Sequence, residues 1–250
     1  MFKQRIAGNM QIIGAFLVIP FENGQIAVVS PINGNVKAEP FVIEMNAGEQ
    51  SDWVVSKPFD KIKMVASSGA KIFAIELKQT DTALKAALSQ NAAATLDSPV
   101  CSDIAVCQDN VLFVTDNGGL NVLNKSTLEN AKAEDAADVD SAQLSGLWTN
   151  GTVVLAASKT GTVTALDATG KALWALDSIG TVQVEPGFDG ETALLCTADG
   201  SATLVNLESG EVVSRAEPTA PVSVPPCKVG DKWFGASRSG EIFEIKFVTE

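Results

Sequence analysis

Histidine and tyrosine are both absent from the sequence. Histidine is the commonest general base and metal ligand of proteins, and tyrosine supplies a phenolic acid. Without histidine the chain has no Ser-His-Asp or Cys-His catalytic arrangement. The enzyme classes that depend on these side chains are therefore excluded.

Cysteine is scarce, and the four cysteines form no Cys-x-x-Cys motif: they are Cys101, Cys107, Cys196 and Cys227. Because histidine is also missing, an ordinary zinc site is excluded. Cys101 and Cys107 fall on one expected strand, roughly 20 Å apart, which is too far for a disulfide. We expect four separate buried thiols, in agreement with a reducing compartment.

Basic residues are few relative to acidic ones. The 18 lysines and arginines stand against 30 aspartates and glutamates, and the net charge is −12. An acidic chain is repelled by phosphate backbones, so nucleic acid and anionic membranes are excluded as direct partners. We interpret the charge as a solubilising surface.

The N-terminal apolar run, Ile12–Ile19, is too short to span a bilayer. Lys3 and Arg5 precede it, as in a signal peptide, but Gly8–Gln11 interrupts the pattern. Pro20–Asn23 stands where a cleavage site would have small residues. We expect no signal peptide, no membrane insertion and a cytoplasmic location.

The most regular stretch of the chain is Gly161–Trp174, with the sequence Gly-Thr-Val-Thr-Ala-Leu-Asp-Ala-Thr-Gly-Lys-Ala-Leu-Trp. Thr162–Leu166 is β-branched and alternates with period 2, which predicts a strand. Asp167–Gly170 predicts a turn, and the chain then returns along a second strand. One hairpin alone is not stable, so we expect it to be part of a larger assembly of strands.

Weaker copies of this hairpin recur along the whole chain. Each copy has a β-rich run, a glycine and another β-rich run, with these glycines 39 to 49 residues apart: Gly24, Gly69, Gly118, Gly161, Gly200 and Gly240. A second glycine turn follows in three copies, at Gly34, Gly170 and Gly210. Repeats of this length with four strands each are typical of β-propeller blades. A β-sandwich of meander hairpins is the alternative.

The pattern Pro…Gly-x-h-x-Ala-Leu-Asp-x-x-Thr-Gly-x-x-x-Trp, with h for an apolar residue, resembles the blade repeat of the quinoprotein-like, or PQQ-like, β-propellers. The match is close over Gly161–Trp174 and fair over Val182–Gly210. In that family the tryptophan docks each blade on its neighbour, so its absence from other copies implies divergent packing. The resemblance concerns the fold, because one fold hosts many functions.

We therefore predict an all-β fold, a single six-bladed β-propeller of four-stranded antiparallel blades over residues 1–250. The expected blades are residues 9–48, 51–97, 98–140, 141–179, 180–220 and 221–250. The last blade lacks its outermost strand, and we expect the N-terminal residues Phe2–Ile6 to supply it.

Three segments carry finer predictions. Val182–Val184 and Val222–Val224, which precede Pro186 and Pro226, are expected to be innermost strands. The alanine-rich segment Thr80–Ala94 is expected to be an irregular outer strand, with a short helix as the alternative.

Carboxylates are the remaining candidates for chemistry. Asp135, Asp138 and Asp140 miss the spacing and the glycine of a calcium loop, so we expect a solvated acidic loop. A carboxylate-based hydrolase needs a paired set. No aspartate or glutamate is singled out by a position on an inner strand. Asp103 and Glu185 are the candidates to inspect, and surface or rim positions are expected for them.

The remaining features favour structure over catalysis. Quinoprotein dehydrogenases of the resembling family have eight blades, a catalytic aspartate, a calcium site and often a vicinal cysteine pair, and this chain lacks that combination. We assign no catalytic, cofactor-binding or metal-binding residue. Four tryptophans are expected to pack rather than form a ligand cage: Trp53, Trp148, Trp174 and Trp233.

The function we predict is non-catalytic: a monomeric propeller that binds a protein or peptide, as a scaffold or as part of a larger protein. One alternative is a cell-envelope assembly scaffold of the resembling family. Another is a propeller that binds a small ligand or is enzymatic, of quinoprotein or carboxylate-hydrolase type.

Overall fold

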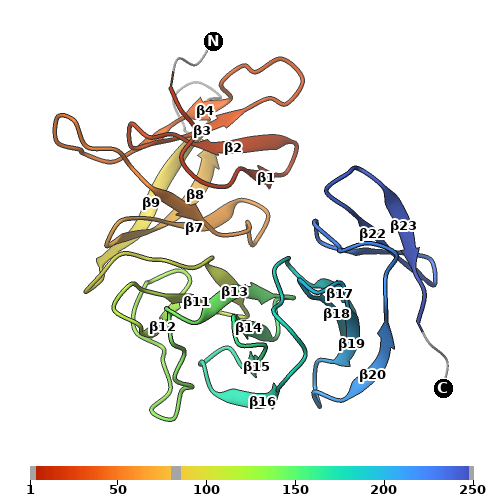
Figure 1. The fold of residues 1–250 in the computed structure, drawn as a ribbon. Coiled ribbons are helices and arrows are strands. Elements are labelled where there is room, and N and C mark those ends of the chain that lie inside the picture. The colour runs from red at the N-terminus through yellow and green to blue at the C-terminus, as the bar shows by residue number, and fades with distance from the viewer. Residues whose placement is uncertain (1–3, 80–85, 248–250) are drawn as a thin grey trace. The chain divides into compact units, whose positions relative to one another are not determined.

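The computed structural model describes residues 4–79 and 86–247, and these form two compact units, residues 1–132 and 133–250. Strands and turns make up the described part of both units (Figure 1). No helix in it is long and apolar enough to cross a membrane. The all-β prediction is confirmed.

The first unit contains three sheets, numbered here in chain order. The first sheet has the order β1(Gln11–Ile13), β2(Phe16–Pro20), β3(Gln25–Val29) and β5(Phe41–Val42). The second has the order β6(Trp53–Val55), β7(Lys63–Ser68), β8(Lys71–Gln79) and β9(Ala86–Thr95), with β4(Ala38–Glu39) parallel to β9. The third has β10(Ala105–Cys107), β11(Asn110–Val114) and β12(Leu120–Asn124).

The second unit repeats the same antiparallel order. The fourth sheet has β13(Leu144–Thr149), β14(Val154–Ser158), β15(Val163–Leu166) and β16(Ala172–Leu176). The fifth has β17(Gly187–Asp189), β18(Thr192–Cys196), β19(Ala202–Asn206) and β20(Val212–Ala216). The sixth has β21(Cys227–Val229), β22(Lys232–Ala236) and β23(Ile242–Ile245).

Each residue range expected for a blade thus contains the main strands of one sheet. The expectation of four strands in every sheet is wrong for the described residues, since the third and sixth sheets have three and the second has five. In the third sheet the fourth-strand position is reduced to one bridge, Leu123 to Asn130, because the chain leaves as a loop after it.

Glycine makes the tight turns between the second and third strands possible. Gly24, Gly161 and Gly200 have φ of 79°, 91° and 93°, values that other residues rarely adopt. Each of their N–H groups donates to the carbonyl three residues earlier, at 3.1 Å in all three turns. The glycine turns inferred from the sequence are confirmed.

Apolar side chains fill the space between neighbouring sheets within each unit. In the second unit Leu155 and Val163 of the fourth sheet pack with Leu195 and Val205 of the fifth. Cores of the same kind join the fifth sheet to the sixth, the first to the second and the second to the third. Each sheet is therefore buried by its neighbours, which no single hairpin achieves.

The innermost strands are displaced from their predicted positions in two sheets. β17 and β21 follow Pro186 and Pro226 instead of preceding them. Val182 makes only an isolated bridge to Thr197, because the chain bends between this residue and the proline. The prediction that the valine-rich segments form these strands is wrong.

The alanine-rich segment is a strand from Ala86 onward, as favoured over a helix, and residues 80–85 lie outside the described part. At the N-terminus, Arg5 and Ala7 hydrogen-bond to Glu22 and Pro20, and Ile6 bridges to Phe21. The prediction that Phe2–Ile6 complete the last sheet is therefore wrong for Arg5 and Ile6, which pair with the first sheet. Phe2 and Lys3 lie outside the described residues. Their part in completing the last sheet remains a prediction.

Candidate interaction site

A short hydroxyl-bearing turn recurs where the second strand of a sheet ends. Its first residue is serine or threonine, its third is polar and its fourth is glycine, as in Thr197–Gly200 and Ser237–Gly240. The first and third side chains hydrogen-bond to each other: Thr197 donates to Asp199, and Ser237 and Ser239 lie 2.7 Å apart. These hydrogen bonds hold the turn in one conformation. The side chain of the second residue takes no part in them, so its direction is set by the backbone of the turn.

A groove of about 550 Å³ lies between two of these turns in the second unit. Ala198 and Arg238, the second residues of the two turns, line it from the fifth and sixth sheets. The segment Ala220–Ser223, which leads into the sixth sheet, lines it as well. This volume is in the range of ordinary ligand and peptide sites.

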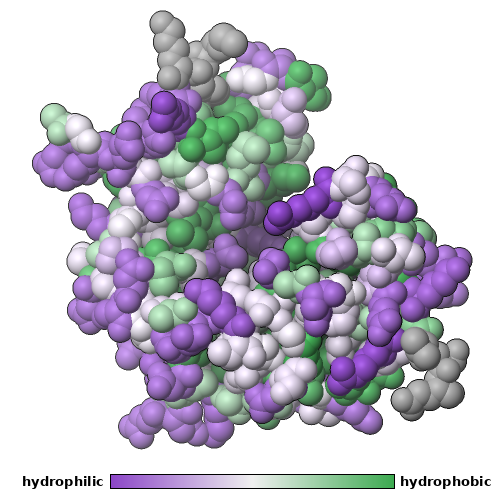
Figure 2. Space-filling view, in the orientation of Figure 1, coloured by the Kyte–Doolittle hydropathy of each residue, from purple (hydrophilic) through white to green (hydrophobic). Residues whose placement is uncertain are grey.

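The groove differs in charge from the rest of the chain. Its lining includes Arg238 and several hydroxyl groups but no aspartate or glutamate, although the net charge of the chain is −12. Hydrophilic side chains cover much of the face drawn in Figure 2. The groove therefore combines an arginine with a lining that contains no carboxylate.

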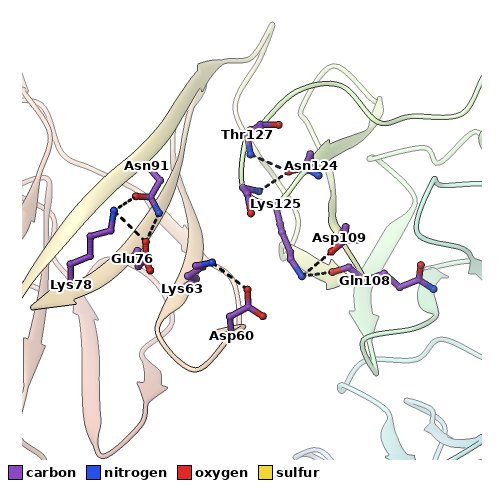
Figure 3. Close-up of polar contacts among 11 residues, drawn as sticks. Asp60, Lys63, Glu76, Lys78, Asn91, Gln108, Asp109, Asn124, Lys125 and Thr127 are labelled. Carbon is purple, nitrogen blue, oxygen red and sulfur yellow. Dashed lines mark hydrogen bonds and ion pairs between the residues drawn. The ribbon is translucent and has the colours of Figure 1, made fainter.

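Cations elsewhere in the chain are often neutralised by neighbouring carboxylates. In the first unit Lys63 lies 3.5 Å from Asp60, and Lys125 lies 3.5 Å from Asp109 while donating to the Gln108 carbonyl (Figure 3). The Lys125 ammonium also lies 5.3 Å from the centre of the Phe59 ring. These contacts engage the charged groups of Lys63 and Lys125 within the protein, so neither lysine is open to a ligand.

A second polar cluster in the first unit joins the exposed faces of β8 and β9. Asn91 donates to Glu76 at 2.9 Å and accepts from Lys78 at 2.6 Å (Figure 3). The Asn91 hydrogen bond is the largest influence lowering the pKa of the Glu76 carboxyl. All three groups are satisfied, so this cluster is a cross-strand support and not a ligand site.

The acidic loop holds the turn of the fourth sheet. Asp135 forms an ion pair with Lys171 at 2.5 Å, and this hydrogen bond lowers the pKa of Asp135. Backbone N–H groups of Ala133 and Ala137 donate to the carbonyls of Thr169 and Gly170. Across residues 4–79 and 86–247, no group of three or more Cys, Asp or Glu side chains is placed to hold a metal ion.

The two carboxylates singled out by sequence lie in different units, Asp103 in the first and Glu185 in the second. Asp103 is exposed and Glu185 is partly buried. Within either unit, the structure does not bring them together with a second candidate.

The cysteines are separate free thiols, as expected, but the expectation that all are buried is wrong. Cys107 and Cys196 are buried, and Cys101 and Cys227 are exposed. Burial raises the pKa of Cys196 to about 12, so this thiol stays protonated. The pKa of Cys101 is also raised, by partial burial and by the nearby Asp116 carboxylate.

All four tryptophans pack in the cores between sheets as predicted, with Trp148 and Trp174 in the core of the fourth and fifth sheets. Trp53 is 1% exposed and donates to the Phe21 carbonyl at 3.2 Å. Trp174 donates to the Leu207 carbonyl of the fifth sheet at 2.8 Å. Trp233 is 3% exposed in the core between the fifth and sixth sheets.

Sequence reasoning missed the groove and Arg238. The available signal was the varied second residue of the turn, which is Lys159, Ala198 and Arg238 in the three sheets of the second unit. That signal gives no indication that the two turns flank a cavity.

Comparison with known proteins agrees with this architecture. Residues 138–246 match the family model described as outer membrane protein assembly factor BamB. No curated protein matches the chain significantly in sequence.

Solved structures of similar fold include three proteins, each 13% identical to this chain. The computationally designed protein Ika8 has a TM-score of 0.71 over 99% of this chain and 72% of its own. BamB from Moraxella catarrhalis has 0.63 over 95% and 71%, and Sqt1 from Saccharomyces cerevisiae has 0.67 over 92% and 67%. The resemblance of this chain to the PQQ-like β-propeller repeat family is thus confirmed, with the matched repeats in residues 138–246.

Proposed function

We propose that this protein is a non-catalytic β-propeller that binds a protein or peptide through the groove between its fifth and sixth sheets. The observation that carries the proposal is a groove of about 550 Å³ in a chain of charge −12. Its lining contains no acidic residue and includes Arg238, a cation that forms no ion pair with the described residues. A partner segment whose charge is complementary to the groove associates faster and more specifically, because electrostatic attraction steers the encounter.

The matched family supports the same class of function. Its description names an assembly factor of the outer membrane, and assembly factors act by binding other proteins. At 13% identity the structural likeness carries the fold alone, so the partner and the cellular location, for which we retain the cytoplasm, are part of the proposal.

We further propose that the six sheets are the blades of one propeller, a single domain over residues 1–250. Support comes from their order along the chain, their shared antiparallel topology and the propeller-like neighbours.

A selection experiment tests the groove. The purified full chain is immobilised and exposed to a phage-displayed library of random twelve-residue peptides. Ala198→Trp fills the groove from a turn position that tolerates long side chains, as Lys159 and Arg238 show. We expect the enriched peptides to lose binding to Ala198→Trp.

The matched control is Lys159→Trp, at the same turn position of the fourth sheet and outside the groove lining. Peptides selected on the wild type are expected to bind this variant normally. If no enriched peptide distinguishes the two tryptophan variants, the groove is not the binding site and the proposal fails.

A further inference from the structure

One backbone hydrogen bond recurs at the hydroxyl-bearing turns and at the related turn of the first sheet. The N–H of the second turn residue donates to a carbonyl 16 or 17 residues earlier, in the segment that leads into the same sheet. The four examples are Glu22 to Arg5 at 3.0 Å, Asp116 to Pro99 at 2.9 Å, Lys159 to Gln143 at 2.6 Å and Ala198 to Thr181 at 2.9 Å.

The sixth sheet breaks this pattern. The equivalent bond would join the N–H of Arg238 to the carbonyl of Pro221, and the structure does not form it. The adjoining bond, from the Ser223 N–H to the Ala236 carbonyl, is kept at 2.9 Å. The leading segment therefore separates from the turn at one point only, beside the groove.

The separation leaves complementary groups open on the groove lining. Arg238 and Pro221 are exposed, and neither makes a hydrogen bond or ion pair with the described residues. The site therefore offers a backbone donor at Arg238, a backbone acceptor at Pro221 and a guanidinium group. An extended peptide carries both an N–H and a C=O per residue, so it can satisfy the two backbone groups together.

The guanidinium group determines the charge of the occupant. Arginine binds carboxylates through two parallel hydrogen bonds, which fix geometry as well as charge. The groove lining presents no carboxylate to compete for it. A basic or neutral segment would leave Arg238 without a counter-ion.

We propose that the groove binds an extended acidic peptide segment of a protein partner. Its backbone inserts between Pro221 and Arg238 in place of the missing hydrogen bond, and an aspartate or glutamate side chain pairs with Arg238. This inference rests on the proposed function, which it deepens by naming the chemistry of the partner.

The test repeats the peptide selection on the full chain, with the wild type and with variants that change the charge at Arg238. On the wild type we expect enrichment of aspartate and glutamate in the selected peptides. Arg238→Glu is expected to select lysine and arginine instead, because the charge that faces the peptide is reversed. Arg238→Ala is expected to weaken the wild-type peptides about tenfold, the usual effect of losing a charge-assisted hydrogen bond.

Arg215→Glu is the control, because Arg215 is exposed on β20 and lies outside the groove lining. It carries the same charge change, so it should retain the acidic peptides. If Arg238→Glu unfolds at a lower urea concentration than Arg215→Glu, the neutral variant Arg238→Gln is used in place of Arg238→Glu. Peptides selected on Arg238→Gln are expected to show no enrichment of aspartate and glutamate.

Two failures are distinguishable. Peptides that require an open groove but show no acidic preference, and that bind Arg238→Ala normally, overturn this inference and leave the proposed function standing. If acidic peptides bind Ala198→Trp with the same affinity as the wild type, both the inference and the proposed function fail, because the charge preference then arises outside the groove.

Discussion

Trp174 shows how one side chain connects two sheets. Its indole N–H reaches the Leu207 carbonyl of the fifth sheet, and its ring lies over Gly210. A Cβ atom at Gly210 would come within 2.7 Å of the ring, and the residue has φ of 73°. Gly210 is therefore required both by its own turn and by the Trp174 ring of the preceding repeat.

We predict that Trp174→Ala lowers the free energy of unfolding by about 2–4 kcal/mol, through lost packing and the lost hydrogen bond. Trp174→Phe retains most of the ring contact and should cost about 1–2 kcal/mol. Urea denaturation followed by circular dichroism measures both.

Leu173→Ala is the matched control, since the preceding residue is 49% exposed. It should change stability by about 0.5 kcal/mol or less. Equal losses for the Leu173 and Trp174 alanine variants would show that Trp174 does not dock the sheets.

At the scale of one element, a five-residue turn occurs three times, with glycine at its last position in two copies and leucine in the third. In Ser30–Gly34, Asn124–Leu128 and Asn206–Gly210 the last N–H donates to the first carbonyl at 2.9 Å. The last residue has φ of 68°, 60° and 73° respectively. A leucine thus occupies a position that elsewhere requires glycine, and it does so because its side chain is buried in the core of the second and third sheets.

The burial and the backbone strain of Leu128 act in opposite directions. Burying a leucine stabilises by about 2–5 kcal/mol relative to alanine, whereas a left-handed residue other than glycine costs roughly 1–2 kcal/mol. We predict that Leu128→Gly is destabilising but less so than Leu128→Ala, because glycine loses the packing and also removes the strain. Urea midpoints of the two variants check this order.

Leu123 of β12 is the control, being buried in the same core with strand geometry. There the order should reverse, with glycine more destabilising than alanine by about 0.5–1 kcal/mol. The same order at both positions would mean that the left-handed conformation of Leu128 carries no strain.

At the scale of the whole molecule, the chain forms two compact units, and the main strands of every sheet pair antiparallel in chain order. If the six sheets are the blades of one propeller, each is stabilised by its neighbours, and the chain should unfold as one domain. Two independent domains would unfold separately.

We predict a single calorimetric transition for the full chain, with equal calorimetric and van't Hoff enthalpies. Leu128→Ala in the first unit and Trp174→Ala in the second should each lower the midpoint of that same transition. Two transitions, each shifted by only one of these variants, would contradict the single-propeller proposal.

The sequence by itself determined the strands and turns. The strand predicted over Thr162–Leu166 is β15 to within one residue, and the repeated glycines all adopt the positive φ that their turns require. These features are local, because β-propensity, alternation and glycine conformation depend on neighbours along the chain. The docking role of Trp174 was implied by the resemblance of the motif to the PQQ-like repeat, and its hydrogen bond to the Leu207 carbonyl agrees with that role.

Only the tertiary structure decided which groups remain open. The bend before Pro186, the exposure of Cys101 and Cys227, and the ion pair of Asp135 with Lys171 all depend on distant segments. The missing bond between Arg238 and Pro221 likewise becomes visible only against its equivalents in other sheets. A polar group is free or satisfied according to what folding brings within about 3 Å of it, and a sequence pattern does not contain that distance.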